Sequence, residues 1–391
     1  MSDVVILSGA RTPMGAFQGE LSGLTAPQLG AAAIAAALGY SGVKPADVSE
    51  TLMGCVLPAG LGQAPARQAS RFGGLPDTVP CTTVNKVCGS GMKAVMIAAD
   101  QIALGRAGIV VAGGMESMTN SPYILPKARG GYRLGHGEIK DHMFLDGLED
   151  AYEHRLMGTY AEDAARHYQF TREAQDAYAT ESLNRAKAAQ ASGAFKHEIV
   201  AIKLATKSGE AEIAADEQPR KADPAKIPTL KPAFAKDGTV TAANSSSISD
   251  GAAALVLTSA GIAAQHGLKP VARVVAQASH AGEPRWFTTA PVGAIGKVLK
   301  LADWTKDDVD LFEINEAFAN VAMIAMRDLG LDHAKVNVNG GACALGHPIG
   351  ASGARILVTL ISALKTRGLK RGVASLCIGG GEATAMAVEL V

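Results

Sequence analysis

Aromatic residues are scarce in this chain, at 5% of its 391 residues, and neither sign of charge is in excess. The 37 basic side chains balance 37 acidic ones, so bulk charge gives no reason to expect a nucleic-acid partner. No apolar run approaches membrane-spanning length, and the first residues lead into a short strand-like run rather than a secretory leader. We therefore expect a cytoplasmic protein with no membrane partner.

Cysteine is also rare: there are five, at widely separated positions. An odd number at such spacing argues against a disulfide framework, and no pair has the CxxC spacing of zinc ligands. We expect reduced thiols and no bound metal.

Glycine, in contrast, is abundant, with 44 residues, and short β-branched or apolar runs alternate with alanine-rich segments. This alternation predicts an α/β fold. The expected strands are 3–7, 51–56, 84–88, 109–112, 253–258, 271–276, 336–338, 373–378 and 385–390. The expected helices are 26–38, 89–103, 158–167, 172–191, 292–301, 317–329 and 352–366.

Two stretches repeat the same order of elements. A Ser-Gly pair opens a helix at Ser90 and again at Ser352, a strand follows, and a glycine pair ends it at Gly113 and at Gly380. We infer two similar α/β halves, although Gly-rich βα units also resemble one another by chance. The turn-rich segment between them, 117–249, is expected to be an insertion over the active-site face.

Cys88 is the most informative residue, because glycine follows it directly and the expected helix 89–103 begins there. The N–H groups and positive dipole end of that helix favour a thiolate at Cys88. His347 and Cys377 lie in two later glycine-rich turns. A nucleophilic sulfur, an imidazole and a second sulfur on tight turns together indicate covalent acyl chemistry. Taken singly, each motif could be a structural turn or a small buried hydrophobe.

Five motifs, in this order along the whole chain, resemble those of the thiolase family. They are SGARTP at 8–13, VNKVCGSG at 84–91, NEAFA at 315–319, NGGACALGHP at 339–348 and CIGGG at 377–381.

The resemblance implies the thiolase fold, two αβα-type halves stacked in five layers (αβαβα) with an inserted loop domain. It implies an N-terminal half of residues 1–118 plus 249–268, a loop domain of residues 119–248 and a C-terminal half of residues 269–391. Residues 120–142 are similar to the tetramerisation loop of biosynthetic-type members, which implies a homotetramer built as a dimer of dimers.

The resemblance also implies roles for five residues in a reversible condensation of two acetyl-CoA molecules to acetoacetyl-CoA and CoA. Cys88 is the nucleophile that carries the acyl group, and His347 accepts its proton and polarises the thioester oxygen. Cys377 is the base of the second step. Asn315 holds a water at the enolate oxygen, unless it is merely a helix cap. The N–H of Gly379 joins that of Cys88 in the oxyanion hole.

Coenzyme A is then a carrier of substrate and product, and no resident cofactor is expected. By family position, Arg220 faces the adenine-phosphate end of CoA, although it could be a solvated loop charge. Ser246 bonds the pantetheine amides. The residues that line the pantetheine slot are Met157, Phe234, Ala242, Ala317 and Phe318.

Two departures from the family pattern concern the acyl pocket. Leu156 stands where many biosynthetic members have histidine. The segment WFTTAP at 286–291 differs from the Met-Gly-x-Gly-Pro version of short-chain members, and the bulk of Phe287 is expected to reshape the acyl pocket. Both put chain-length preference in question, not the reaction. Cys343 replaces an aliphatic residue and is read as a core substitute, and Cys55 and Cys81 are read as structural.

Four alternative functions are weighed against this one. A broader-range 3-ketoacyl-CoA thiolase of β-oxidation would share all five motifs. A ketoacyl synthase would pair its nucleophile with two histidines or with histidine and asparagine, whereas this chain has Cys377. An idle CoA- or lipid-binding relative would be expected to have lost Cys88, His347 or Cys377, and a Cys-His hydrolase leaves Cys377 unexplained.

Overall fold

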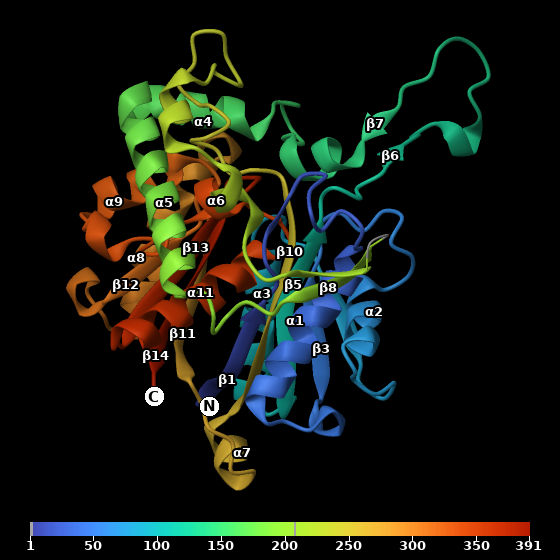
Figure 1. The fold of residues 1–391 in the computed structure, drawn as a ribbon, viewed down its shortest axis with the longest axis vertical. Coiled ribbons are helices and arrows are strands. Elements are labelled where there is room, and N and C mark those ends of the chain that lie inside the picture. Colours follow the sequence, from blue (N-terminus) through green and yellow to red (C-terminus); the bar gives the residue numbers. More distant parts are fainter. Residues whose placement is uncertain (1–2, 207–208) are drawn as a thin grey trace.

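The computed structural model describes residues 3–206 and 209–391, and a large mixed sheet forms its centre (Figure 1). Its strands follow the order β12-β13-β14-β11-β1-β10-β5-β3-β4, and the short β2 pairs with β10. The strands are β1 (Val4–Arg11), β2 (Gly15–Ala16), β3 (Glu50–Gly54), β4 (Cys81–Val84), β5 (Ile109–Ser117), β10 (Ser249–Ser259), β11 (Ala272–Ala281), β12 (Leu311–Ile314), β13 (Arg371–Ile378) and β14 (Glu382–Leu390).

The sheet consists of two half-sheets joined by one weak seam. The strands β1 and β11 pair only through Val5↔Arg273 and Ile6↔Ala272. On either side the pattern is the same: β3 and β5 are parallel like β12 and β13, and β10 runs antiparallel to β5 as β14 does to β13. The two similar halves expected from the internal repeat are therefore present.

Helices form three layers around the half-sheets. The helices α3 (Ser90–Ala103) and α11 (Ser352–Arg367) pack against each other and, with strands of both half-sheets, enclose one apolar core. The helix α1 (Ala26–Ser41) covers the N-terminal half-sheet, and α8 (Ala290–Ala302) with α9 (Ala319–Leu329) covers the other. Together these give the expected αβαβα order.

Local sequence explains why the longer helices begin where they do. The Thr25 N–H donates to Gln28 Oε1 (2.9 Å), one half of a capping box at the start of α1. The Thr171 hydroxyl accepts from the Ala174 N–H (3.2 Å) and caps α5 (Arg172–Ser192). Glycines in the left-handed region, Gly42 and Gly193, end both helices.

Three expected strands differ from the structure. The expected strand 84–88 is displaced, because β4 ends at Val84 and residues 85–88 form the turn before α3. The strand 109–112 does not stop at Gly113: β5 continues to Ser117, and a Cβ at Gly114 would collide with the carbonyl oxygen of Gly350. Glycine is used there for close backbone approach rather than for a turn. The expected strand 336–338 is reduced to one bridge, between Phe312 and Val336.

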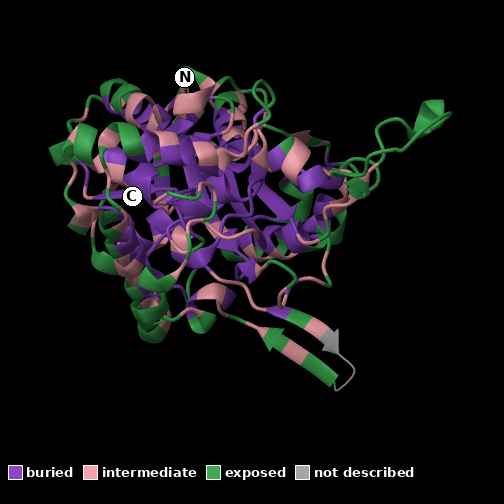
Figure 2. Cartoon of the chain, turned by 90° about the horizontal axis from the view of Figure 1, so that it is seen from above, coloured by how far each residue is buried: buried purple, intermediate pink, exposed green. Residues whose placement is uncertain are grey.

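The inserted segment carries helices of its own beside two excursions. Figure 2 shows an exposed arm and a separate hairpin leaving the buried body. The arm contains β6 (Tyr123–Ile124) and β7 (Lys140–Asp141), and the hairpin pairs β8 (Ile202–Thr206) with β9 (Gly209–Ile213). The segment also contains α4 (Met157–Tyr168) and α6 (Glu217–Lys221), beside α5. Three short α-helices lie outside it: α2 (Pro65–Phe72), α7 (Ala260–Gln265) and α10 (Ala342–Leu345).

Within residues 3–206 and 209–391, no helix combines the length and the hydropathy needed to cross a membrane. The division into 1–118 with 249–268, 119–248 and 269–391 stays a prediction.

Candidate active site

Cys88 lies in a restrained turn between β4 and α3. The preceding residue, Val87, has a φ of +46°, which is rare for a β-branched side chain. Asn85 Oδ1 accepts from the Val87 N–H (3.0 Å), and Ser90 Oγ donates to the Val87 carbonyl (2.6 Å). These two side chains hold a strained backbone in place, as is common where a reactive group must be presented.

The Cys88 sulfur has two backbone donors, but its surroundings favour the thiol. The N–H groups of Gly379 and of Cys88 itself reach the sulfur and lower its pKa. Burial has the larger, opposite effect, with a smaller contribution from the charge of Glu116, and raises the pKa of Cys88 to about 11. The N–H groups at the helix start favour the thiolate as expected, but desolvation outweighs them, so the thiol is favoured before substrate binds.

The ring of His347 has a defined tautomer. Its Nδ1 lies 2.5 Å from Ser352 Oγ, and the same hydroxyl donates to the Pro348 carbonyl at 2.9 Å. Because a carbonyl can only accept, both contacts are hydrogen bonds when the hydroxyl proton points to Pro348 and Ser352 accepts from Nδ1–H. The Nε2 atom is then left with a lone pair that can receive a proton.

The His347 ring is uncharged at neutral pH. Burial, and secondarily the positive charge of Arg355, lower the pKa of His347 to about 3. Asn315 Nδ2 lies 3.4 Å from Nε2, and its Oδ1 lies 3.5 Å from Arg355 Nη2. Phe318, not Asn315, is the N-cap residue of α9, so the capping alternative for Asn315 is not what the structure has.

Cys377 lies at the end of β13 and is fully buried. Burial and, secondarily, the charge of Cys88 raise its pKa well above the usual range, so the two sulfurs are close enough to interact. A Cβ at Gly89 would collide with Ile378 Cδ1, and an ion pair joins Lys86 to Glu382. These contacts hold the Cys88 turn and the Cys377 turn together.

A cavity of about 350 Å³ opens onto the Cys88 sulfur. Its walls include His347 and Gly379, six predicted CoA-binding residues and both departures from the family pattern. These lining residues are Ser246, Met157, Phe234, Ala242, Ala317, Phe318, Leu156 and Phe287. Cys377 and Asn315 are not part of this lining.

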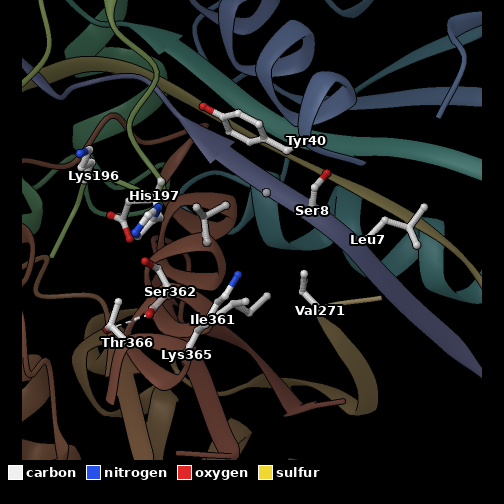
Figure 3. Close-up of a pocket in the computed structure, with 13 residues that line it drawn as sticks. Leu7, Ser8, Tyr40, Lys196, His197, Val271, Ile361, Ser362, Lys365 and Thr366 are labelled. Carbon is white, nitrogen blue, oxygen red and sulfur yellow. Dashed lines mark hydrogen bonds between the residues drawn. The ribbon is translucent and has the colours of Figure 1, made fainter. Parts of the chain in front are cut away.

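Arg220 does not line this cavity. It lies on α6, where it pairs with Glu20 (2.5 Å) and donates to the Asp216 carbonyl. A larger cavity of about 530 Å³, between β1 and α11, contains none of the predicted site residues (Figure 3). The role of Arg220 at the phosphate end of CoA stays a prediction.

Cys343 and Cys55 each lie beside a glutamate residue. Cys343 Sγ lies 3.7 Å from the Glu316 carbonyl, and Cys55 Sγ lies 3.6 Å from Glu116 Oε1. All five cysteines are free thiols. In the described part of the chain, no group of three or more His, Cys, Asp or Glu side chains could hold a metal ion.

Sequence reasoning did not assign Ser352, Glu116 or Ile349 to the site. Ser352 could have been found, since it opens a helix five residues after His347. Glu116 could not, because its partners Val56 and Gly350 are distant in the chain.

Two family models match this chain: the thiolase N-terminal domain over residues 4–261 and the thiolase C-terminal domain over residues 268–390. The chain belongs to the thiolase family. This thiolase is 52% identical to the acetyl-CoA acetyltransferase of Cupriavidus necator, and the match covers 100% of both chains. It is 53% identical to acetyl-CoA acetyltransferase 2 of Arabidopsis thaliana, over 100% of this thiolase and 97% of the relative.

A solved structure shows the same fold. The crystal structure of the Bacillus anthracis acetyl-CoA acetyltransferase superposes with a TM-score of 0.97 at 44% identity, over 100% of this thiolase and 99% of that chain.

Proposed function

We propose that this thiolase is an acetyl-CoA C-acetyltransferase, which joins two acetyl-CoA molecules to acetoacetyl-CoA and CoA and runs the reverse thiolysis. The observation that carries the proposal is the meeting of Cys88, His347 and the Gly379 N–H at one cavity without charged side chains, with Cys377 close enough to Cys88 for their charges to interact. Relatives about 50% identical over their full length are acetyl-CoA acetyltransferases, which supports the same reaction.

In the first half-reaction, His347 Nε2 takes the Cys88 proton and the sulfur attacks the thioester carbonyl. The developing oxyanion is bound by the N–H groups of Cys88 and Gly379, and each such donor contributes roughly 3 to 4 kcal/mol. The C–S bond to CoA then breaks. Cys377, a thiol because its pKa is raised, gives its proton to the leaving CoA sulfur.

In the second half-reaction, Cys377 is a thiolate and His347 is an imidazolium. The Cys377 sulfur removes a proton from the methyl carbon of a second acetyl-CoA. His347 and a water held by Asn315 stabilise the enolate oxygen. The enolate carbon attacks the Cys88 thioester, and Cys88 leaves and recovers its proton from His347, so the resting state is restored.

A thiolysis assay tests this function and its acyl range. We expect CoA-dependent cleavage of acetoacetyl-CoA, and a fall in kcat/KM for 3-ketohexanoyl-CoA and longer substrates, because Phe287 and Phe318 meet edge to face in the cavity wall. Higher kcat/KM for the longer substrates would favour a broad-range 3-ketoacyl-CoA thiolase. No cleavage of any of them would overturn the proposal.

The same proposal includes a homotetramer in the cytoplasm that uses CoA as carrier and has no resident cofactor. Its support is the exposed arm, on which Leu134 is 98% and Ile139 is 68% exposed. Apolar side chains this exposed are typical of an interface. Replacing Leu134 and Ile139 with lysine should reduce the sedimentation coefficient to that of a dimer.

A further inference from the structure

Glu116 is a buried carboxyl group that the proposed mechanism does not use. It lies next to the last residue of β5, is 0% exposed, and faces Gly251 of β10. Among the described residues it has no cationic partner. Burial raises the pKa of Glu116 to about 7, against the opposing effect of the N–H groups that it binds.

The Glu116 carboxylate binds the backbone of two separate segments. Its Oε2 accepts from the N–H groups of Val56 (3.0 Å) and Gly350 (2.9 Å), and its Oε1 accepts from the Leu57 N–H (3.1 Å). The Cys55 sulfur lies 3.6 Å from Oε1. One side chain thus ties the segment after β3, in the N-terminal half, to the turn that follows His347 in the C-terminal half.

Both segments border the reacting sulfur. Gly350 is three residues after His347, and its neighbour Ile349 lines the same cavity as Cys88. Leu57 and Ile349 belong to one buried apolar cluster, against which Cys88 packs. A shift of the 346–350 turn would therefore move both the imidazole and the wall beside the sulfur.

We propose that Glu116 is a positioning residue that fixes the His347 turn against the Cys88 half of the molecule and whose ionised form disfavours the Cys88 thiolate. The catalytic part of this inference rests on the proposed function, whereas the part that concerns the thiol does not. Three converging N–H donors require a group that only accepts, and a carboxylate is such a group. The same charge contributes to the raised pKa of Cys88.

The decisive variant is Glu116→Gln, which keeps the shape but replaces one acceptor oxygen by an NH₂ group that must face an N–H donor. We expect kcat for acetoacetyl-CoA thiolysis to fall about tenfold or more, with KM for CoA nearly unchanged, because a buried donor loses its partner. Alkylation of Cys88 by iodoacetamide, followed on its peptide by mass spectrometry, should move to lower pH, because the nearby negative charge is gone.

Two further variants separate the effect of the Glu116 charge from the effect of its hydrogen bonds to the backbone. Glu116→Asp keeps the charge but shortens the reach, so kcat should fall while the pH profile of Cys88 alkylation stays close to that of the wild type. Asp310→Asn is the matched control. Asp310 accepts from the N–H groups of Lys370 (2.9 Å) and Arg371 (2.8 Å), at the end of β13 that is remote from Cys377. It should lower thermal stability and leave kcat and the alkylation profile unchanged.

The proposal is overturned if Glu116→Gln lowers only the melting temperature, as Asp310→Asn does, or if its alkylation profile matches that of the wild type. If Glu116→Gln does not fold, Glu116→Asp becomes the decisive variant. An unchanged kcat in Glu116→Asp would show that Glu116 does not position the His347 turn. A wild-type protein without thiolysis activity would refute the proposed function, yet the alkylation profiles would still test the effect of Glu116 on Cys88.

Discussion

The two cysteine turns of the active site are built differently. Cys88 is half-buried on the wall of the cavity, follows a strained valine and is touched by two backbone N–H groups. Cys377 is fully buried at the end of a regular strand, where β13 pairs it with Ala383 of β14. The difference teaches that only the first sulfur borders the cavity, whereas the second is enclosed and its pKa is raised by burial and by the charge of the first.

Cys88→Ser should have the largest effect. The hydroxyl is a much weaker nucleophile and leaving group than the sulfur, so thiolysis should fall by about 10³-fold or more. Steady-state cleavage of acetoacetyl-CoA measures this, with Cys81→Ser on the edge strand β4 as the control. If Cys88→Ser kept an activity near that of Cys81→Ser, Cys88 would not be the nucleophile, and the contrast between the two cysteine turns would have no functional meaning.

Cys377→Ala should separate the two half-reactions. We expect condensation to fall by about 10² to 10⁴-fold, since its carbon base is missing, while Cys88 is still acylated by acetyl-CoA at a reduced rate. Mass spectrometry of the acylated Cys88 peptide, beside the rate of acetoacetyl-CoA formation, gives both quantities. Equal loss of both would show that Cys377 is not specific to the second step.

The pH dependence of Cys88 alkylation tests the direction of its pKa shift. A raised pKa means that the thiolate fraction is small at pH 7 and grows about tenfold per pH unit until about pH 11. Iodoacetamide rates on the Cys88 peptide should follow this line. If the alkylation rate instead reached a plateau below pH 8, the pKa of Cys88 would be lowered, as the helix start alone predicts.

Ser352→Ala should have an intermediate effect, since it removes the acceptor that fixes the His347 tautomer. We expect kcat/KM to fall about tenfold, the equivalent of one lost hydrogen bond. Ser352→Thr keeps a hydroxyl and should recover part of the loss. If the alanine and threonine variants behave alike, the hydroxyl does not orient the ring.

Leu156→His should have the smallest effect. Leu156 lines the cavity and has no proposed part in the chemistry of Cys88 and Cys377. We therefore expect KM for CoA substrates to change a few-fold while kcat stays within about twofold. Parallel Michaelis–Menten curves for wild type and variant provide the comparison. A large change in kcat with constant KM would contradict this assignment.

Local sequence signals were enough to predict much of the fold. Thr25 and Thr171 mark true helix starts, and the run from Ile109 predicts a buried strand, because caps and apolar periodicity act over a few residues. Local signals failed where a contact between distant parts of the chain determines the local structure. Gly113 and Gly114 continue a strand because another backbone lies against them, and residues 336–338 keep one bridge where the other half has β4.

The candidate site follows the same division. Cys88, His347 and Cys377 could be located from their motifs. The direction of the pKa shift of Cys88 could not be predicted, because it depends on how much water the folded protein removes from the sulfur. Glu116 and Arg355 act through residues far along the chain, so no local pattern identifies them.

The lining of the Cys88 cavity has a consequence for which acyl groups it admits. Among the described residues that form it, none is Lys, Arg, Asp or Glu. An acyl chain that ended in a carboxylate would have to give up its hydration there without meeting a counter-ion, which is costly. Thioesters of dicarboxylic acids should therefore be turned away by dehydration alone, with no steric gate required.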